Sequence, residues 1–228
     1  MVKQHQKRKS IPRTWALKRK ESTWVTRPSP GAHSRIHGMS INTALKEMLR
    51  LTKTTKETRQ VLQHVLVNGR KVSDHRFIVG LFDVISFPKT KENFRIVLNQ
   101  KGKLEFRKIS EAEAKLRPAK ILNKTRLKGG KLQLNLSDGT NILLKKNDYA
   151  AEDTLILENP SNTISAHLKL EKGALIYLIA GKHIGSSGAI KEIKGHMLAV
   201  TDAASKAAFE TLKKYAIVIG KDKPMITL

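Results

Sequence analysis

The feature that most constrains this chain is its charge. It carries 44 Lys and Arg residues against 19 Asp and Glu, a formal net charge of +25 over 228 residues. Charge of one sign at this density repels itself in a compact state and far exceeds what solubility requires. We therefore expect the chain to act against a polyanion, and the candidates are nucleic acid, an anionic membrane surface and an acidic protein.

Composition excludes several other classes. The chain has no cysteine, which removes disulfide scaffolds, thiolate zinc sites, iron–sulfur clusters and cysteine nucleophiles. The longest apolar run is about the length of one strand, so no transmembrane helix is predicted. The N-terminal residues are polar and basic without the apolar centre of a signal peptide, so secretion is not expected.

The charge is unevenly distributed. Residues 1–40 carry +9, residues 41–80 carry +5 and residues 81–130 carry +8, whereas residues 131–172 carry −1 and residues 173–228 carry +4. We therefore expect the surface that meets the polyanion to lie mainly in the first 130 residues, and the near-neutral segment to be structural or to face protein.

Residues 1–40 show no apolar periodicity, and Pro12, Pro28 and Pro30 break any helix. Both tryptophans lie here among clustered cations, a mixture that suits nucleic acid because cations neutralise phosphates while indoles stack on bases or pack on a neighbouring domain. We expect this segment to order only on RNA; a solvated tail or a nuclear-import signal is the alternative. Its candidate RNA-binding residues are Lys7, Arg8, Lys9, Arg13, Trp15, Lys18, Arg19, Lys20, Trp24, Arg27, His33 and Arg35.

Residues 41–66 favour two short helices, the first capped by Ser40 and the second starting at Thr54 or Thr55. The Asn68-Gly69 pair then predicts a tight hairpin turn. Cations on one side of this helix–helix–hairpin unit suggest that it lies against an RNA groove; a small domain with an ordinary solvated face is the alternative. The candidates here are Lys46, Arg50, Lys53, Lys56, Arg59, Arg70, Lys71 and Arg76.

The rest of the chain favours strands. An apolar strand is expected over Phe77–Phe87 and a strand pair around the turn at Gly102, followed by a short helix capped by Ser110. A second hairpin turns at Asp138-Gly139, and Leu155–Leu157 is expected to be an edge strand. Residues 173–228 resemble a small β-barrel, in which Ala207–Thr211 is expected to be a strand although its surroundings, Ala203–Tyr215, have helix propensity. The glycine-rich loop 181–188 carries the candidates Lys182 and His183.

Several segments, in this order, resemble the archaeal and eukaryotic S-four-e family of small-subunit ribosomal proteins over nearly the whole chain. They are Arg27-Pro28-Ser29-Pro30-Gly31-Ala32-His33, Val67-Asn68-Gly69-Arg70-Lys71-Val72, residues 80–85, residues 89–95, Phe209-Glu210-Thr211-Leu212 and residues 217–221. Each segment alone is a weak signal, and the combination is specific.

The resemblance implies an α+β, multidomain, β-rich protein in four parts. These are a basic extended RNA-binding tail over 1–40, an S-four-type RNA-binding domain over 41–106, a central β-rich domain over 107–172 and a KOW or SH3-like barrel over 173–228. It also implies binding to small-subunit ribosomal RNA and neighbouring ribosomal proteins on cytoplasmic ribosomes. No catalytic residue, metal, cofactor, membrane contact or homo-oligomer is expected.

Enzymatic sites find little support in the sequence. The loop at residues 181–188 lacks the spacing of a phosphate-binding P-loop, and His33 and His37 have no third metal ligand nearby. Asp83, in an apolar strand, is interpreted as structural. The alternatives that remain are a KOW-containing transcription or chromatin factor and an RNA-modifying enzyme; a membrane-surface protein would need a basic amphipathic helix that is absent.

The hairpin provides a direct test. Changing Arg70 and Lys71 together to Ala should weaken RNA binding without lowering the melting temperature, because both residues follow an exposed turn and serve as phosphate ligands. Binding of small-subunit ribosomal RNA and thermal melting check this prediction. RNA affinity equal to that of the unmodified chain would reassign the hairpin to solvent.

Overall fold

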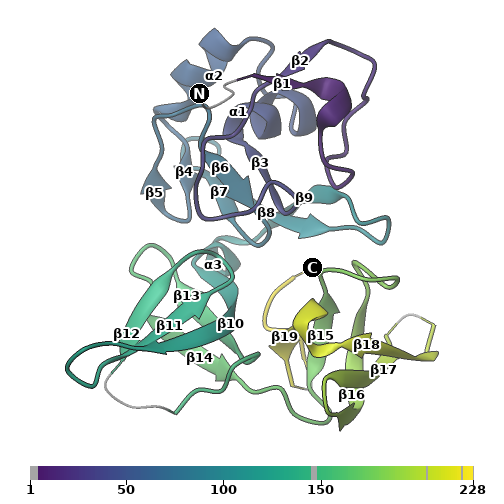
Figure 1. Cartoon of the computed structure of the whole chain (residues 1–228). Helices are drawn as coiled ribbons and strands as arrows, with labels where there is room; N and C mark the ends of the chain where they lie inside the picture. The colour runs from purple at the N-terminus through teal and green to yellow at the C-terminus, as the bar shows by residue number, and fades with distance from the viewer. Residues whose placement is uncertain (1–4, 145–147, 204, 222, 228) are drawn as a thin grey trace. The chain divides into compact units, whose positions relative to one another are not determined.

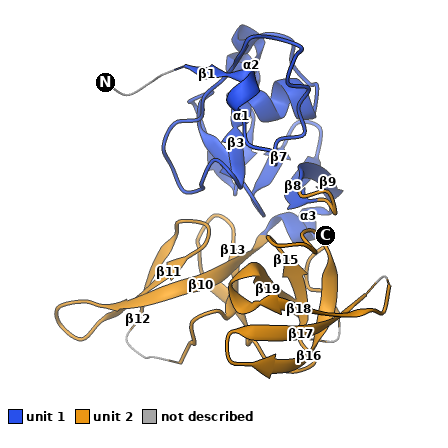
Figure 2. Ribbon diagram, turned by 45° about the vertical axis from the view of Figure 1, so that its right-hand side comes forward, with its two compact units in different colours: residues 1–98, 103–115 blue, residues 99–102, 116–228 orange. Residues whose placement is uncertain are grey.

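The computed structural model describes residues 5–144, 148–203, 205–221 and 223–227, so the first four residues of the predicted tail lie outside the described residues. The chain divides into two compact units (Figure 2). Unit 1 contains residues 1–98 and 103–115, and unit 2 contains residues 99–102 and 116–228. The fold is rich in β-strands and has few helices (Figure 1).

Unit 1 is built on an antiparallel sheet with strand order β5-β4-β7-β8-β9. Two further strand pairs, β1 with β2 and β3 with β6, join the N-terminal segment to itself and to the domain. The strands of the unit are β1 Gln6–Lys7, β2 Trp24–Val25, β3 Gly38–Ser40, β4 Leu66–Val67, β5 Arg70–Lys71, β6 Ile78–Gly80, β7 Val84–Phe87, β8 Glu92–Leu98 and β9 Leu104–Ile109. Its α-helices are α1 Ile41–Thr43, which continues as a π-helix over Ala44–Met48, α2 Thr55–Leu62 and α3 Glu111–Ala114.

The helix starts confirm the predicted caps. The Ser40 hydroxyl accepts the Thr43 backbone N–H, and the Thr54 hydroxyl accepts that of Glu57 at 3.2 Å. Ser110 caps α3 in the same way. In each case a side-chain oxygen satisfies a backbone donor that the first helical turn leaves without a partner, so a local rule was sufficient to locate these helices.

The first hairpin is also confirmed. Asn68 has φ 50° and Gly69 has φ 75°, as a primed turn between β4 and β5 requires. The single strand expected over Phe77–Phe87, however, is wrong. The chain turns between β6 and β7, where Phe82 has φ 67° and the Gly80 N–H donates to the Asp83 carboxylate at 2.8 Å. The buried carboxylate stabilises a turn that an apolar pattern does not predict.

Unit 2 contains two antiparallel five-stranded sheets. The first has strand order β12-β11-β10-β13-β14 and the second β18-β17-β16-β15-β19. The strands of the first sheet are β10 Leu116–Arg126, β11 Leu132–Leu136, β12 Asn141–Leu144, β13 Thr154–Glu158 and β14 Ile164–Leu168. Those of the second are β15 Leu175–Leu178, β16 Ser187–Lys194, β17 Met197–Asp202, β18 Ala208–Leu212 and β19 Ala216–Gly220.

The hairpin at Asp138-Gly139 is confirmed by β11 and β12. The edge position predicted for Leu155–Leu157 is wrong, because β13 lies between β10 and β14, neither of which was predicted. Pro118 makes β10 look broken in the sequence. It is tolerated because residues 116–120 pair only with β13 while residues 121–126 pair with β11, so one side of the strand at Pro118 needs no ladder donor.

The strand predicted within Ala203–Tyr215 is confirmed as β18, which pairs with β17 from Ala208 to Leu212. Buried side chains from both sheets of unit 2 form one cluster, in which Ile156 and Leu168 of the first sheet pack with Ile176 and Val218 of the second. Packing against β17 therefore outweighs the helix propensity of the alanines and lysines in this segment.

A buried ion pair closes one end of the first sheet of unit 2. The Arg117 guanidinium lies 3.0 Å from the Asp138 carboxylate, and both side chains are almost fully buried. The guanidinium also donates to the side-chain oxygens of Asn159 at 3.2 Å, Thr140 at 3.1 Å and Asn162 at 2.7 Å. Arg117 thus joins β10 to two loops at the same end of the sheet.

Arg117→Met should lower the free energy of unfolding of unit 2 by about 3–5 kcal/mol, because it leaves the Asp138 carboxylate buried without its cation. Denaturant unfolding followed through tyrosine checks this, since all three tyrosines, Tyr149, Tyr177 and Tyr215, lie in unit 2. The matched control is Arg126→Met on the same strand, where the side chain is exposed. Equal stability of the two variants would contradict the structural role of Arg117.

Candidate nucleic-acid interface

The candidate residues divide by exposure. Most of the cations proposed from sequence are exposed, whereas Arg27, Arg76 and His183 are half-buried, and the side chains of Arg8, Trp15 and His33 are buried. The exposed candidates are Lys7, Lys9, Arg13, Lys18, Arg19, Lys20, Trp24, Arg35, Lys46, Arg50, Lys53, Lys56, Arg59, Arg70, Lys71 and Lys182. Exposure leaves a cation available to a phosphate and the Trp24 indole available to a base, so these side chains define the candidate interface.

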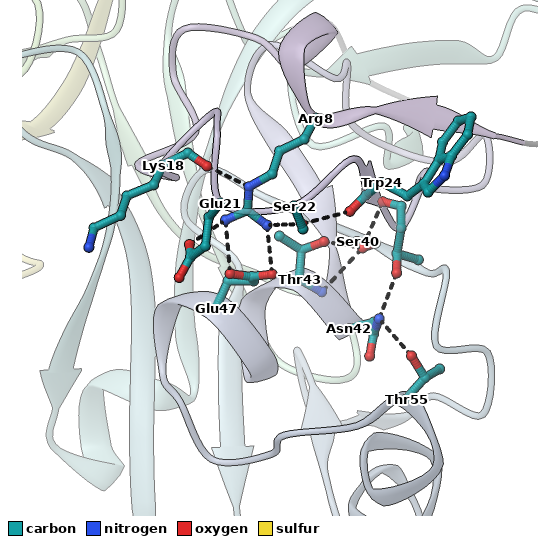
Figure 3. Close-up of polar contacts among 11 residues, drawn as sticks. Arg8, Lys18, Glu21, Ser22, Trp24, Ser40, Asn42, Thr43, Glu47 and Thr55 are labelled. Atoms are coloured by element: carbon teal, nitrogen blue, oxygen red, sulfur yellow. Dashed lines mark hydrogen bonds and ion pairs between the residues drawn. The ribbon is translucent and has the colours of Figure 1, made fainter.

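Arg8 corrects a prediction. Its side chain is 1% exposed, and its guanidinium donates to both carboxylate oxygens of Glu47, at 2.9 and 3.1 Å (Figure 3). It also lies 3.0 Å from the Glu21 carboxylate and donates to Ser22 Oγ at 3.1 Å and to the Lys18 carbonyl. Arg8 therefore ties the N-terminal segment to the π-helix and is not available to RNA.

The ion pair also sets the protonation of Glu47. The hydrogen bonds from Arg8 lower the pKa of this carboxyl below its ordinary value of 4.5, against the opposing effect of burial. Because the folded-state pKa is depressed, the pair stabilises the fold above pH 4.5 and loses that contribution as the pH falls through the lowered value.

Trp15 corrects a second prediction. Its side chain belongs to the core, at 2% exposed, and its indole N–H is shared between the carbonyl oxygens of Arg35 and Gly38, each at 3.1 Å. Ile11 is buried nearby in sequence, at 4% exposed. The expectation that this segment orders only on RNA is therefore wrong for residues 5–40, which bury their own apolar side chains in unit 1.

His33 is a third correction. Its side chain is 6% exposed and its Nε2 lies 2.9 Å from the Asp83 carboxylate, which also accepts the Asn68 amide at 2.7 Å. Burial alone would raise the pKa of Asp83, but His33 and the hydrogen bonds to the carboxylate hold it below its ordinary value. His33 thus connects the N-terminal segment to the turn between β6 and β7. Asp83 stabilises that turn, which agrees with its interpretation as a structural residue.

The cations of the helical region lie on exposed positions around the π-helix and α2. The start of α2 is held by Glu57, whose carboxylate accepts the Lys53 backbone N–H at 2.8 Å and the Thr54 hydroxyl at 2.9 Å. Lys56 and Arg59 are therefore presented from a well-capped helix, and Lys53 lies just before its cap. Arg76 differs, since its Nε donates to the Arg27 carbonyl at 3.3 Å.

Unit 2 carries the remaining candidates. Lys182 is exposed, and the His183 ring stacks on Phe209 with a centroid separation of 4.0 Å and an interplanar angle of 16°. Sequence reasoning used Phe209 only as part of a family motif and missed this contact. The loop and β18 are far apart in sequence, so no short-range pattern could join them.

A polar pocket of about 230 Å³ in unit 1 was also missed. Its lining comes from β2 and the residues beside it, from α1 and its π-helical continuation, and from the first residue of α2 (Figure 3). Lining residues include Ser22, Trp24, Thr26, Asn42, Lys46 and Thr55. Neutral hydroxyl and amide side chains scattered over 34 positions give no sequence signal, and only folding of the N-terminal segment onto the helices brings them together.

The described side chains include groups that can bind a nucleic acid. Among the described residues there is no cluster of His, Asp and Glu that could hold a metal ion. No helix in the described part of the chain has the length and apolar character to cross a membrane. The exposed cations can neutralise phosphates, and the exposed indole of Trp24 can stack on a base.

Comparison with known proteins defines the class first. Two family models match: the "RS4NT (NUC023) domain" over residues 2–35 and "Ribosomal family S4e" over residues 90–164. The chain is 40% identical to small ribosomal subunit protein eS4 of Methanocella arvoryzae, covering 99% of this chain and 98% of that protein. It is 39% identical to the eS4 protein of Archaeoglobus fulgidus, covering 100% and 99% of the two chains.

A solved structure is similar as well. The crystal structure of 30S ribosomal protein S4e from Thermoplasma acidophilum matches with a TM-score of 0.70 and 25% identity, covering 81% of this chain and 96% of that one. The chain belongs to the S4e family of ribosomal proteins, as the resemblance in the sequence predicted.

The Arg8–Glu47 pair predicts a pH dependence. Glu47→Gln should lower the free energy of unfolding of unit 1 at neutral pH by about 1.5–3 kcal/mol. It should also reduce the loss of stability that the unmodified chain shows as the pH falls below 4.5, since the titrating carboxylate is gone. Denaturant unfolding at several pH values, followed through Trp15 in a Trp24→Phe background, measures both effects.

The matched control is Glu21→Gln. The Glu21 side chain also contacts Arg8 but is 57% exposed, so its removal should cost less than about 1 kcal/mol. A Glu47→Gln variant with the pH profile of the unmodified chain would show that Arg8 does not depend on Glu47.

Proposed function

We propose that this chain is a structural, non-catalytic constituent of the small ribosomal subunit that binds small-subunit ribosomal RNA and works on cytoplasmic ribosomes. The observation that carries the proposal is full-length similarity to proteins named small ribosomal subunit protein eS4. The net charge of +25 and the exposed cations of unit 1 support it, because RNA phosphates neutralise such a surface.

The mechanism is electrostatic docking followed by fitting of shape. Each Lys or Arg that meets a phosphate releases condensed counterions, so affinity falls steeply with salt. By analogy with duplex DNA, about six to ten such contacts would reduce affinity by roughly three to five decades between 50 and 200 mM salt. Shape and accessible RNA groups then choose the binding site.

The four-part organisation stays part of this proposal. The boundaries are a basic segment over 1–40, an S4-type RNA-binding domain over 41–106, a central β-rich domain over 107–172 and a KOW-type barrel over 173–228. In its favour, residues 5–40 pack into unit 1 beside a helix–helix–hairpin arrangement, and the five antiparallel strands β15–β19 make up one sheet. The segment 131–172, with its charge of −1, suits contact with neighbouring ribosomal proteins better than contact with RNA.

The interface residues are likewise proposed, with Arg8, Trp15 and His33 now assigned to the interior. The proposed RNA ligands in unit 1 are the exposed cations of the N-terminal segment, of the helical region and of the hairpin. Arg27, Arg76 and His183 are half-buried and contribute part of their surface, and Lys182 belongs to the proposed barrel.

Changing Lys7, Lys9, Lys18 and Lys20 together to Gln should flatten the salt dependence of RNA binding by up to about four units of slope in log affinity against log salt. All four side chains are exposed, so stability should change little. Filter binding of small-subunit ribosomal RNA across a salt series measures the slope.

Arg8→Gln is the matched contrast. It removes a charge from the same segment, but the charge is buried. The variant should therefore have a lower free energy of unfolding, and, while it is folded, the same salt dependence of RNA binding as the unmodified chain. If the quadruple variant has the same slope of log affinity against log salt as the unmodified chain, the N-terminal segment does not bind RNA phosphates. The cations of the helices can then be tested in the same way.

A further inference from the structure

The pocket in unit 1 has the size and composition of a small-molecule subsite. Its volume of about 230 Å³ far exceeds the roughly 10–15 Å³ that one water molecule needs. Its lining includes Thr26 and Thr55, which carry hydroxyl groups, Asn42, which carries an amide, and Trp24, whose side chain is exposed. A flat, polar heterocycle fits such a lining better than an aliphatic side chain does.

The charges around the pocket favour an anionic ligand. Glu47 contributes the one acidic side chain of the lining, and both of its oxygens accept hydrogen bonds from Arg8 (Figure 3). Lys46 contributes the one cation, is exposed and forms no ion pair with any described residue. Arg8 is thus the hydrogen-bonded partner of Glu47, and Lys46, whose charge also acts on that carboxylate, is exposed to a ligand.

A buried acceptor is left over in the same lining. The Asn42 side chain donates from Nδ2 to Thr26 Oγ1 at 2.6 Å and to Thr55 Oγ1 at 3.4 Å (Figure 3). Its Oδ1 has no hydrogen-bond partner among the described residues, although Asn42 is only 3% exposed. Buried polar atoms are rarely left unsatisfied, because each costs free energy.

Trp24 is placed differently from the other tryptophan. It is 56% exposed, its ring meets His5 edge-on at a centroid distance of 5.8 Å, and it belongs to the pocket lining. A large exposed indole beside a polar pocket matches the way in which unpaired RNA bases are held, stacked on an aromatic ring and hydrogen-bonded along their edges.

We propose that this pocket receives one unstacked base of the RNA. Trp24 stacks on the base, Asn42 Oδ1 accepts a hydrogen bond from a base N–H group, and Lys46 contacts the adjoining phosphate. The inference rests on the proposed function, RNA binding, and adds to it a base-level contact in a chain whose other proposed contacts are to phosphates.

Stacking and charge neutralisation have different salt signatures. Trp24→Ala should weaken binding of small-subunit ribosomal RNA roughly five- to a hundred-fold at unchanged salt slope, because it removes a stacking surface and no charge. Trp24→Phe should recover most of that loss. Lys46→Ala should instead reduce the slope by about one. Leu143→Ala, an exposed apolar change in unit 2, is the matched control and should bind as the unmodified chain does.

A second measurement reads the base itself. Chemical probing of base accessibility on the same RNA should find one position that the unmodified chain protects and Trp24→Ala does not. Thr55→Leu, which adds volume to the pocket without changing charge, should also lose this protection. Backbone footprints elsewhere should be the same for all three chains.

The outcomes separate this inference from the function on which it rests. If the unmodified chain fails to bind the RNA even at low salt, the proposed function falls. If the unmodified chain binds and Trp24→Ala and Thr55→Leu match it in both affinity and base protection, the function stands and the pocket is not a base site. A lowered melting temperature for Trp24→Ala shifts the test to Trp24→Phe and Thr55→Leu, which must then show the expected pattern.

Discussion

The structure of unit 1 depends on one buried interaction, the pairing of Arg8 with Glu47. It turns a cation from a strongly basic segment inward and fixes that segment on the π-helix. Trp15 and the contact of His33 with Asp83 hold the same segment at two further points. Because these contacts are internal, the N-terminal segment is presented to a partner already folded, which reduces the entropy that binding must overcome.

Buried cations and exposed cations have different roles throughout the described part of the chain. Cations that serve the fold are buried and paired, as Arg117 is with Asp138 and Lys120 with Glu152. Burial lowers the pKa of Lys120, and its contact with Glu152 opposes that shift. The cations proposed for RNA remain on the surface, where their mutual repulsion is screened until phosphates neutralise them. The acids that pair with buried cations, such as Glu47 and Asp138, do not neutralise the exposed ones.

Local rules predicted a large part of the fold. The caps at Ser40, Thr54 and Ser110 and the turns at Asn68-Gly69 and Asp138-Gly139 depend on contacts within a few residues, and all were confirmed. The failures depend on distant partners. Strand β10 contains Pro118 and several charged residues, and it is a strand because β11 and β13 pair with different halves of it.

By itself, the sequence determined the charge, the class of partner, the family and the strand-rich character, because composition and short motifs carry that information. Only the tertiary structure decided which cations face outward, since Arg8 and Lys9 are neighbours with the same charge and opposite exposures. It also assembled the pocket beside Trp24 from three separate segments. Burial and long-range hydrogen bonds depend on contacts between residues that are far apart in the sequence. A local sequence pattern does not determine those contacts.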